Sequence, residues 1–130
     1  MRRITTLFFI TLLLSGCASV DDSKRTITLD KATRIYDNAI RWGDHDVANS
    51  LRKQPAAGPR PALLKQIKVT SLEPVNVSIS EDQLRVQRVV EIRYYNENSM
   101  KIVTLMDHQT WEYDAAAKSW FLLTPPPAFR

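Results

Sequence analysis

A chain of 130 residues, 44% hydrophobic and 25% charged, has the composition of one globular domain with an ordinary hydrophobic core. Its formal charge of +4 includes two arginines at the extreme N-terminus. The other basic residues are spread along the chain without the clustered footprint of a nucleic-acid-binding surface, so we exclude that class. No segment recurs along the sequence, which excludes solenoids and propellers.

The N-terminus has the organisation of an export signal. The two arginines precede an apolar run over residues 4–14, interrupted only by threonines. This run suits the hydrophobic region of a signal peptide, because a helix needs about 20 apolar residues to cross a bilayer. Ser15 and Gly16 then supply the small side chains that a signal peptidase accepts before its cut. The alternative is a short buried N-terminal element with a core cysteine.

The order Leu14-Ser15-Gly16-Cys17 resembles a bacterial lipobox, and Cys17 is the single cysteine of the chain. The resemblance implies cleavage between Gly16 and Cys17, a thioether-linked diacylglycerol on Cys17, and acylation of the new amino group. Three acyl chains exceed what stable membrane anchoring requires. Ala18 follows, where enteric lipoproteins of the inner membrane carry aspartate, so the resemblance implies the outer membrane, facing the periplasm.

Two helices are predicted after this anchor. Residues 17–27 are polar and aperiodic, which predicts a flexible tether behind the lipidated cysteine. Thr28 is placed as the N-cap of a helix whose apolar residues recur every three or four positions, and Gly43 suits its C-terminal stop. Asp44 suits the N-cap of a second, short helix. Trp42, at the corner between them, is expected to plug one end of the core.

Beyond the loop over residues 54–61, the hydrophobic pattern changes from helical to alternating. Four strands are expected, with Pro74 marking a bulge or an edge strand. Turns are expected at residues 80–82, 96–99 and 114–118. Short connections of this kind predict an antiparallel meander. The predicted fold class is α+β, an N-terminal helical hairpin packed on a curved four-stranded antiparallel sheet.

The predicted domain organisation has four parts. Residues 1–16 form a lipoprotein signal peptide, 17–27 the lipidated cysteine and tether, 28–124 a single α+β domain, and 125–130 a proline-rich tail. The tail is expected to fold rigidly against the domain with Phe129 tucked in. The alternative is a docking peptide for an aromatic groove of a partner.

Two stretches carry a family resemblance. The Arg41-Trp42-Gly43-Asp44 corner and the strand ending in Trp111-Glu112-Tyr113-Asp114 resemble the cone-shaped fold of the nuclear transport factor two-like superfamily. More narrowly, the chain resembles small lipoproteins of Gram-negative bacteria with that fold. Because the superfamily includes enzymes, ligand binders and assembly modules, the resemblance implies a fold and no activity.

Catalytic members of that superfamily place an acid–base pair inside the cone. The resemblance therefore makes the two histidines, His45 and His108, the candidates for such a pair. His45 sits at the expected start of the second helix, where a solvated or locally bonded histidine is the simpler interpretation. His108 follows Asp107 on a strand, and neighbouring strand residues point to opposite faces. A catalytic His108 would therefore need a carboxylate from another strand, such as Glu91 or Glu112. No metal site or cofactor is expected, because convergent ligands are missing.

The remaining candidates are aromatic and basic side chains that either complete the core or form a binding surface. Tyr94 and Tyr95 are adjacent on a strand, so one of them must lie outside the core. An exposed tyrosine beside Arg88 and Arg93 would suit a contact surface. The candidate pocket or interaction residues are Tyr36, Trp42, Arg93, Tyr95, His108 and Trp111.

The leading functional hypothesis is a non-enzymatic outer-membrane lipoprotein whose periplasmic domain binds a protein partner or supports envelope assembly. It follows from the expected anchor, the compact size and the lack of a convincing catalytic pattern. A small-ligand binder that uses the cone interior is the second hypothesis. A hydrolase or isomerase that uses His108 is the third. An open cavity containing His108 and a carboxylate would favour the last two.

Overall fold

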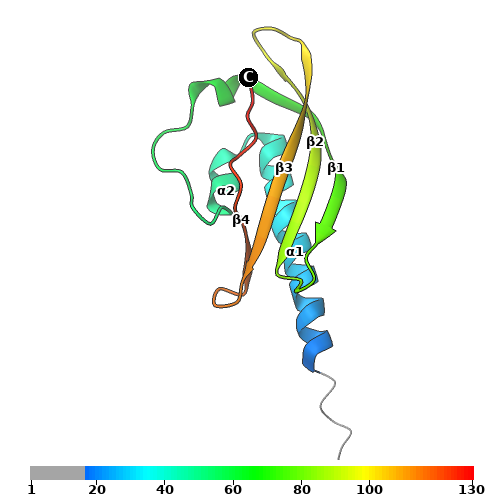
Figure 1. Cartoon of the computed structure of the whole chain (residues 1–130). Coiled ribbons are helices and arrows are strands. Elements are labelled where there is room, and N and C mark those ends of the chain that lie inside the picture. The colour runs from blue at the N-terminus through cyan, green and yellow to red at the C-terminus, as the bar shows by residue number, and fades with distance from the viewer. Residues whose placement is uncertain (1–16) are drawn as a thin grey trace, which may run out of the picture.

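The computed structural model describes residues 17–130, with side chains from residue 21 onward. The predicted signal peptide, Gly16 included, lies outside the described residues. Helices precede a single antiparallel sheet with strand order β1-β2-β3-β4 (Figure 1). The elements are α1 (Cys17–Trp42), α2 (His45–Ser50), the 3-10 helix η1 (Ala62–Gln66), β1 (Ile67–Ile79), β2 (Arg85–Asn96), β3 (Ile102–Asp114) and β4 (Ser119–Leu122). The α+β prediction is confirmed; the helical hairpin is one long and one very short helix.

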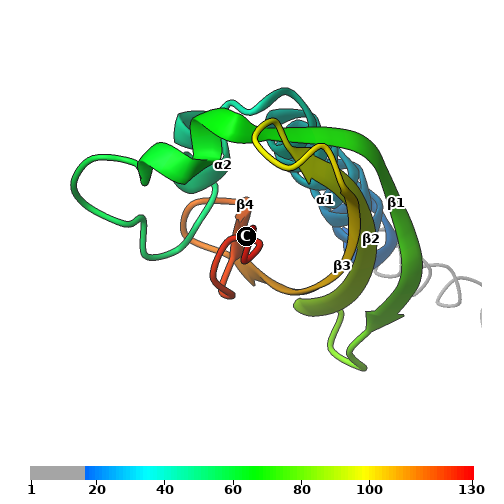
Figure 2. The same cartoon turned by 90° about the horizontal axis from the view of Figure 1, so that it is seen from above.

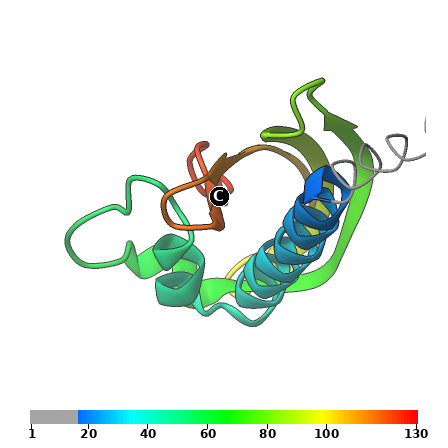
Figure 3. The ribbon, with the colours of Figure 1, turned by 90° about the horizontal axis from the view of Figure 1, so that it is seen from below.

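The sheet is strongly curved, and α1 closes its open side (Figures 2 and 3). Viewed from above, the strands curve around α1, which contacts both edge strands, β1 and β4. Alternation along β2 places one set of side chains on the inner face toward α1 and the other set on the outer face. The inner face therefore holds the core, and the outer face is left without a covering helix.

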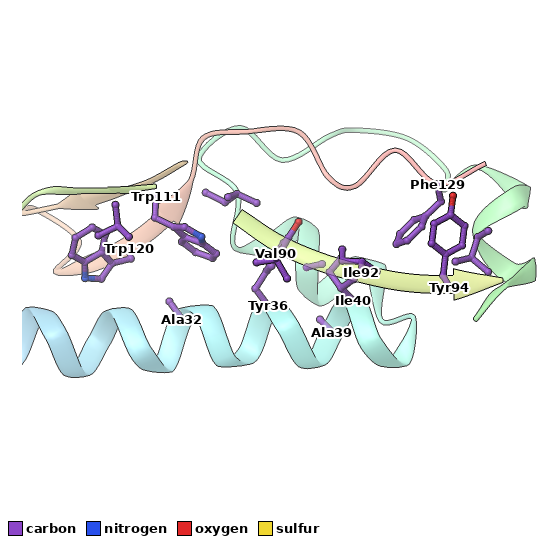
Figure 4. Close-up of a cluster of buried hydrophobic side chains, with 14 residues drawn as sticks. Ala32, Tyr36, Ala39, Ile40, Val90, Ile92, Tyr94, Trp111, Trp120 and Phe129 are labelled. Carbon is purple, nitrogen blue, oxygen red and sulfur yellow. The ribbon is translucent and has the colours of Figure 1, made fainter. Parts of the chain in front are cut away.

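The core fills the space between α1 and the inner face of the sheet. Tyr36 and Ile40 of α1 point toward Val90 and Ile92 of β2 (Figure 4). The Tyr36 and Trp111 rings meet edge to face, with centroids 5.6 Å apart, a favoured aromatic geometry. These contacts are what the two apolar periodicities predicted. Core residues are Ala32, Tyr36, Ala39, Ile40, Ala48, Ile67, Val86, Val90, Ile92, Tyr94, Trp111, Trp120, Leu122 and Phe129.

The proline-rich C-terminus folds back onto the domain. The buried Phe129 ring lies edge to face against Tyr94, with centroids 4.9 Å apart. The Tyr94 hydroxyl oxygen accepts a hydrogen bond from the Arg130 amide at 3.2 Å. The prediction that Phe129 is tucked in is therefore confirmed, and the ring is not free to dock into a partner's groove.

The flexible tether is a wrong prediction, because α1 begins at Cys17. The Thr26 and Thr28 hydroxyls donate back to the carbonyls of Asp22 and Lys24, so Thr28 lies within the helix and does not cap it. The Trp120 indole of β4 donates to the Arg25 carbonyl at 3.0 Å. Polar composition alone predicted a coil, whereas packing against β4 stabilises a helix.

The corner after α1 has the predicted backbone, but its tryptophan does not have the predicted role. Gly43 ends the helix with φ of 76°, and Asp44 caps α2 by accepting the Val47 amide hydrogen at 3.3 Å. Trp42 was expected in the core, yet it is 78% exposed. The core-facing side of the last turn is occupied by Ala39 and Ile40, so Trp42 projects away from the sheet.

Strand β1 lies at an edge, and its register shifts near Pro74 confirm the predicted irregularity. A first shift, between Val69 and Ser71, moves the inward positions from odd to even residues. Ile67 and Val69 therefore face the core before this shift, whereas Leu72 and Pro74 occupy the inward positions after it. Val77 and Ile79 regain the inner face after the second shift but stay more than half exposed, because the lower part of the edge strand is only thinly covered.

Candidate functional site

A hydrogen-bonded polar cluster lies inside the domain between α1, β2 and β3. Arg88 of β2 bonds the Asp37 carboxylate of α1, Nη2 to Oδ2 at 2.7 Å and Nη1 to Oδ1 at 3.2 Å. Its Nη1 also donates to Gln109 Oε1 at 2.8 Å. Gln109 in turn donates to Asp107 and accepts from the Trp111 indole, at 2.8 and 3.0 Å. Every member makes hydrogen bonds, as buried polar groups require.

Two acidic groups of this region have altered titration. The pKa of Tyr36 is raised, first by burial and then by the nearby Asp107 charge. Its hydroxyl is buried without a hydrogen-bond partner among the described residues. The pKa of Asp107 is also raised by burial, while the hydrogen bond from Gln109 acts in the opposite direction. Both groups are held toward the neutral form, which suits a packed interior.

The expected interior binding site is occupied by side chains. Tyr36 and Trp111, both candidate pocket residues, are almost fully buried and touch each other at the centre of the core. A cleft of about 330 Å3 lies instead between α1 and β1. Its lining is Asp30, Thr33, Arg34, Asp37, Asn38, Arg41, Leu72, Pro74 and Arg88. No histidine lines this cleft, and most of its charged groups are already paired with each other.

The histidines lie apart from the buried carboxylates. Asp107 is buried whereas His108 is exposed on the outer face opposite Val89, as strand alternation predicted. His45 is half-buried at the start of α2, and its pKa is lowered, first by burial and then by the Arg60 guanidinium. Among the described side chains no three His, Cys, Asp or Glu residues gather to hold a metal ion. Of the two carboxylates expected as partners of His108, Glu91 does share its outer face, opposite Met106, but it accepts from Arg93 at 3.1 Å. Glu112 is paired with Lys53 and Arg85, and no carboxylate within residues 21–130 lies at ion-pair distance from His108.

Three of the predicted candidate residues, Arg93, Tyr95 and His108, come together on the outer face of β2 and β3. Tyr95 pairs with Ile102, Arg93 with Thr104, and Glu91 with Met106 across the two strands. Ile102 and Met106 are 61% and 47% exposed. We call the group formed by Arg93, Tyr95, Ile102, Met106 and His108 the outer patch. Arg93 also donates to Glu91 at 3.1 Å, which sets its guanidinium along the strand.

The N-terminal site is the one that the comparisons with known proteins address. Residues 1–18 match the family model of the prokaryotic membrane lipoprotein lipid attachment site. The protein is a membrane-anchored lipoprotein. Its anchor is a lipid, and within residues 17–130 the lipoprotein has no helix apolar and long enough to cross a bilayer. No curated protein and no solved structure matched the chain. The likeness to the nuclear transport factor two-like superfamily stays a prediction.

Sequence reasoning placed Arg88 on the contact surface and missed its buried cluster. Arg88 interrupts the apolar even positions of β2, so an arginine in the inward register was the available signal. Its partner Asp37 comes from α1, 51 residues earlier. The sequence alone cannot pair residues that far apart, because the pairing depends on where α1 crosses the sheet.

Proposed function

We propose that this lipoprotein is a non-enzymatic interaction protein whose outer patch docks a protein partner in the periplasm. The observation that carries the proposal is the outer patch itself. Apolar Ile102 and Met106 lie beside Tyr95 and Arg93 on a sheet face that no helix covers. Aromatic residues, methionine and arginine are enriched in protein interfaces, and the polar His108 would lie near the rim.

The proposed location is the periplasmic side of the outer membrane. Lipid attachment at Cys17 accounts for the anchor. The choice of membrane rests on Ala18, which occupies the position where an aspartate retains enteric lipoproteins in the inner membrane. An envelope protein is therefore the proposed class of partner.

Interior packing favours interaction over the ligand-binding and enzymatic alternatives. Tyr36 and Trp111 occupy the space where a cone-interior ligand would sit. The enzymatic alternative needs a carboxylate free to act with His108 on one substrate. Glu91, on the same outer face, is held by Arg93, and Glu112 is held by Lys53 and Arg85, which favours structural roles for both carboxylates.

Photocrosslinking in cells tests the docking surface directly. A photoreactive amino acid is placed at Met106 of the full-length lipidated protein, and at the exposed turn residue Ala116 as the matched control. A crosslink to one envelope protein from position 106, and none from 116, is expected. The pair Tyr95→Ala and Ile102→Ser should abolish it while leaving membrane attachment intact.

Two outcomes would change the conclusion. A crosslinked species of twice the protein's own mass would identify a second copy of this chain as the occupant. Absence of any specific crosslink from position 106, with normal amounts of anchored and folded protein, would contradict the docking proposal.

A further inference from the structure

Helix α1 has an exposed face that the hydrophobic core does not use. Its inner side carries the core residues, while the opposite side carries side chains that recur every three or four positions and therefore share one helix face. We call this face the α1 stripe. Its members, all exposed, are Lys24, Ile27, Lys31, Arg34, Asn38, Arg41 and Trp42.

The α1 stripe carries an excess of positive charge. Arg34 pairs with Asp30 at 2.5 Å on the flank of the stripe. No carboxylate within residues 21–130 lies at ion-pair distance from Lys24, Lys31 or Arg41. Lys24 and Lys31 therefore carry unpaired charge on this face, and Arg41, which donates to the Thr70 carbonyl at 3.3 Å, adds a third cation near its end. Such a row attracts an anionic surface.

Two large apolar side chains lie among these cations. Ile27 is 68% exposed and Trp42 is 78% exposed. The Arg41 guanidinium lies over the Trp42 ring, 5.5 Å from its centroid, so the ring stays at the surface beside a charge. Tryptophan favours the headgroup level of a bilayer, where its ring is amphipathic. A helix face of basic residues with a few apolar ones is typical of helices that lie on membranes.

The lipid attachment site determines which surface this face meets. Cys17 carries the anchor and is also the first residue of α1, so no flexible segment separates the membrane from the helix. At 1.5 Å per residue, Lys24 lies about 10 Å and Trp42 about 38 Å along the axis from Cys17. A helix attached at one end to the bilayer brings the whole stripe onto the headgroups when it lies flat.

We propose that the α1 stripe binds the anionic phospholipid surface next to the lipid anchor. The inference rests on lipid attachment at Cys17 and is independent of the protein partner proposed above. It also gives the domain an orientation. Because α1 covers the inner face of the sheet, binding through α1 turns the outer patch away from the membrane and toward the aqueous compartment.

Fluorescence of Trp42 tests this contact in the intact lipidated protein. The protein is reconstituted in vesicles of phosphatidylcholine alone or mixed with phosphatidylglycerol, each with brominated acyl chains that quench nearby tryptophan. Trp111 and Trp120 are buried and serve as the constant background. Strong quenching is expected only with phosphatidylglycerol, and it should disappear in high salt and in Trp42→Phe.

Charge-reversal variants show whether binding depends on the position of the cations in the α1 stripe or only on the net charge of the protein. Each cation near an anionic surface favours binding roughly fivefold, so Lys24→Glu with Lys31→Glu should lower the ratio of docked to undocked protein by at least about 25-fold. The matched control is Lys65→Glu with Lys101→Glu, which makes the same charge change at exposed positions outside α1. This control should keep the quenching of the wild type.

Three results would overturn the proposal. The first is Trp42 quenching that is equal in both kinds of vesicle. The second is equal loss of quenching in the two double variants when near-ultraviolet circular dichroism shows both folded. The third is a photocrosslink from position 38 to a protein in cells, which would make the stripe a protein interface.

Discussion

Arg88 and Asp37 face each other across the boundary between sheet and helix, with Nη2 of the guanidinium 2.7 Å from Oδ2 of the carboxylate. A second bond of 3.2 Å makes the contact bidentate, the strongest geometry for this pair of groups. The pair joins α1 to β2, and Gln109 extends it to β3. Its effect on stability depends on the desolvation of both charges.

Asp37→Asn should destabilise the domain by about 3 kcal/mol, because it leaves the Arg88 guanidinium buried without a counter-ion. Urea unfolding of the soluble domain portion measures the change. Asp30→Asn is the matched control, since the Asp30–Arg34 pair is exposed and should contribute less than about 1 kcal/mol. An equal loss of unfolding free energy in both variants would contradict the expectation that breaking the buried Arg88–Asp37 pair costs more than breaking an exposed one.

Tyr36→Phe should stabilise the domain by about 1 kcal/mol at neutral pH, because it removes a buried hydroxyl without a partner. The substitution should also change how stability varies with pH under alkaline conditions. Burial raises the pKa of Tyr36 in the folded state, so stability is lost as pH rises above the ordinary tyrosine value of about 10. Urea midpoints between neutral and alkaline pH should fall less steeply for the phenylalanine variant.

Asp107→Asn should change how stability varies with pH between acidic and neutral conditions. Burial raises the pKa of this carboxyl, so folding favours its protonated form and the stability contribution is lost as pH rises through the folded value. The asparagine variant does not titrate there. Its advantage over the wild type should grow from about pH 4 upward, which urea midpoints across this range would show. Parallel profiles would contradict the direction of the shift.

Trp120→Phe should loosen the start of α1. The substitution keeps an aromatic ring but removes the indole donor to the Arg25 carbonyl. Hydrogen exchange of the backbone amides around Arg25 should accelerate severalfold, because one net hydrogen bond contributes roughly 1 kcal/mol. Trp42→Phe removes an exposed indole and should leave those amides unchanged. Rapid exchange in the wild type itself would restore the tether interpretation.

Cys17→Ser should remove the mature-size protein from the membrane fraction, since a hydroxyl does not accept the thioether-linked lipid. Membrane flotation followed by immunoblotting measures the distribution. The uncleaved precursor must be distinguished from the mature form by its size. A mature-size serine variant that still floats with membranes would contradict lipid attachment at this residue.

Much of the architecture was predictable from local pattern. Alternation and turn residues gave four antiparallel strands, and Gly43 and Asp44 gave the corner because positive φ and capping are local properties. Long-range packing was not predictable. The start of α1 is bonded by Trp120, which is 95 residues away from its partner Arg25. The two shifts in β1 depend on its alignment with β2.

Of the candidate sites, one was also predictable from local sequence, and the others depended on tertiary packing. The lipid attachment site is contiguous, so charge, apolar length and the order around Cys17 determined it without any structure. Whether Trp42 lies in the core or in the solvent depended on the side from which α1 packs. The same packing brought Arg88 under α1 and left Tyr95 and Met106 outside. Only the tertiary structure decides these positions, because burial depends on which distant residues cover a side chain.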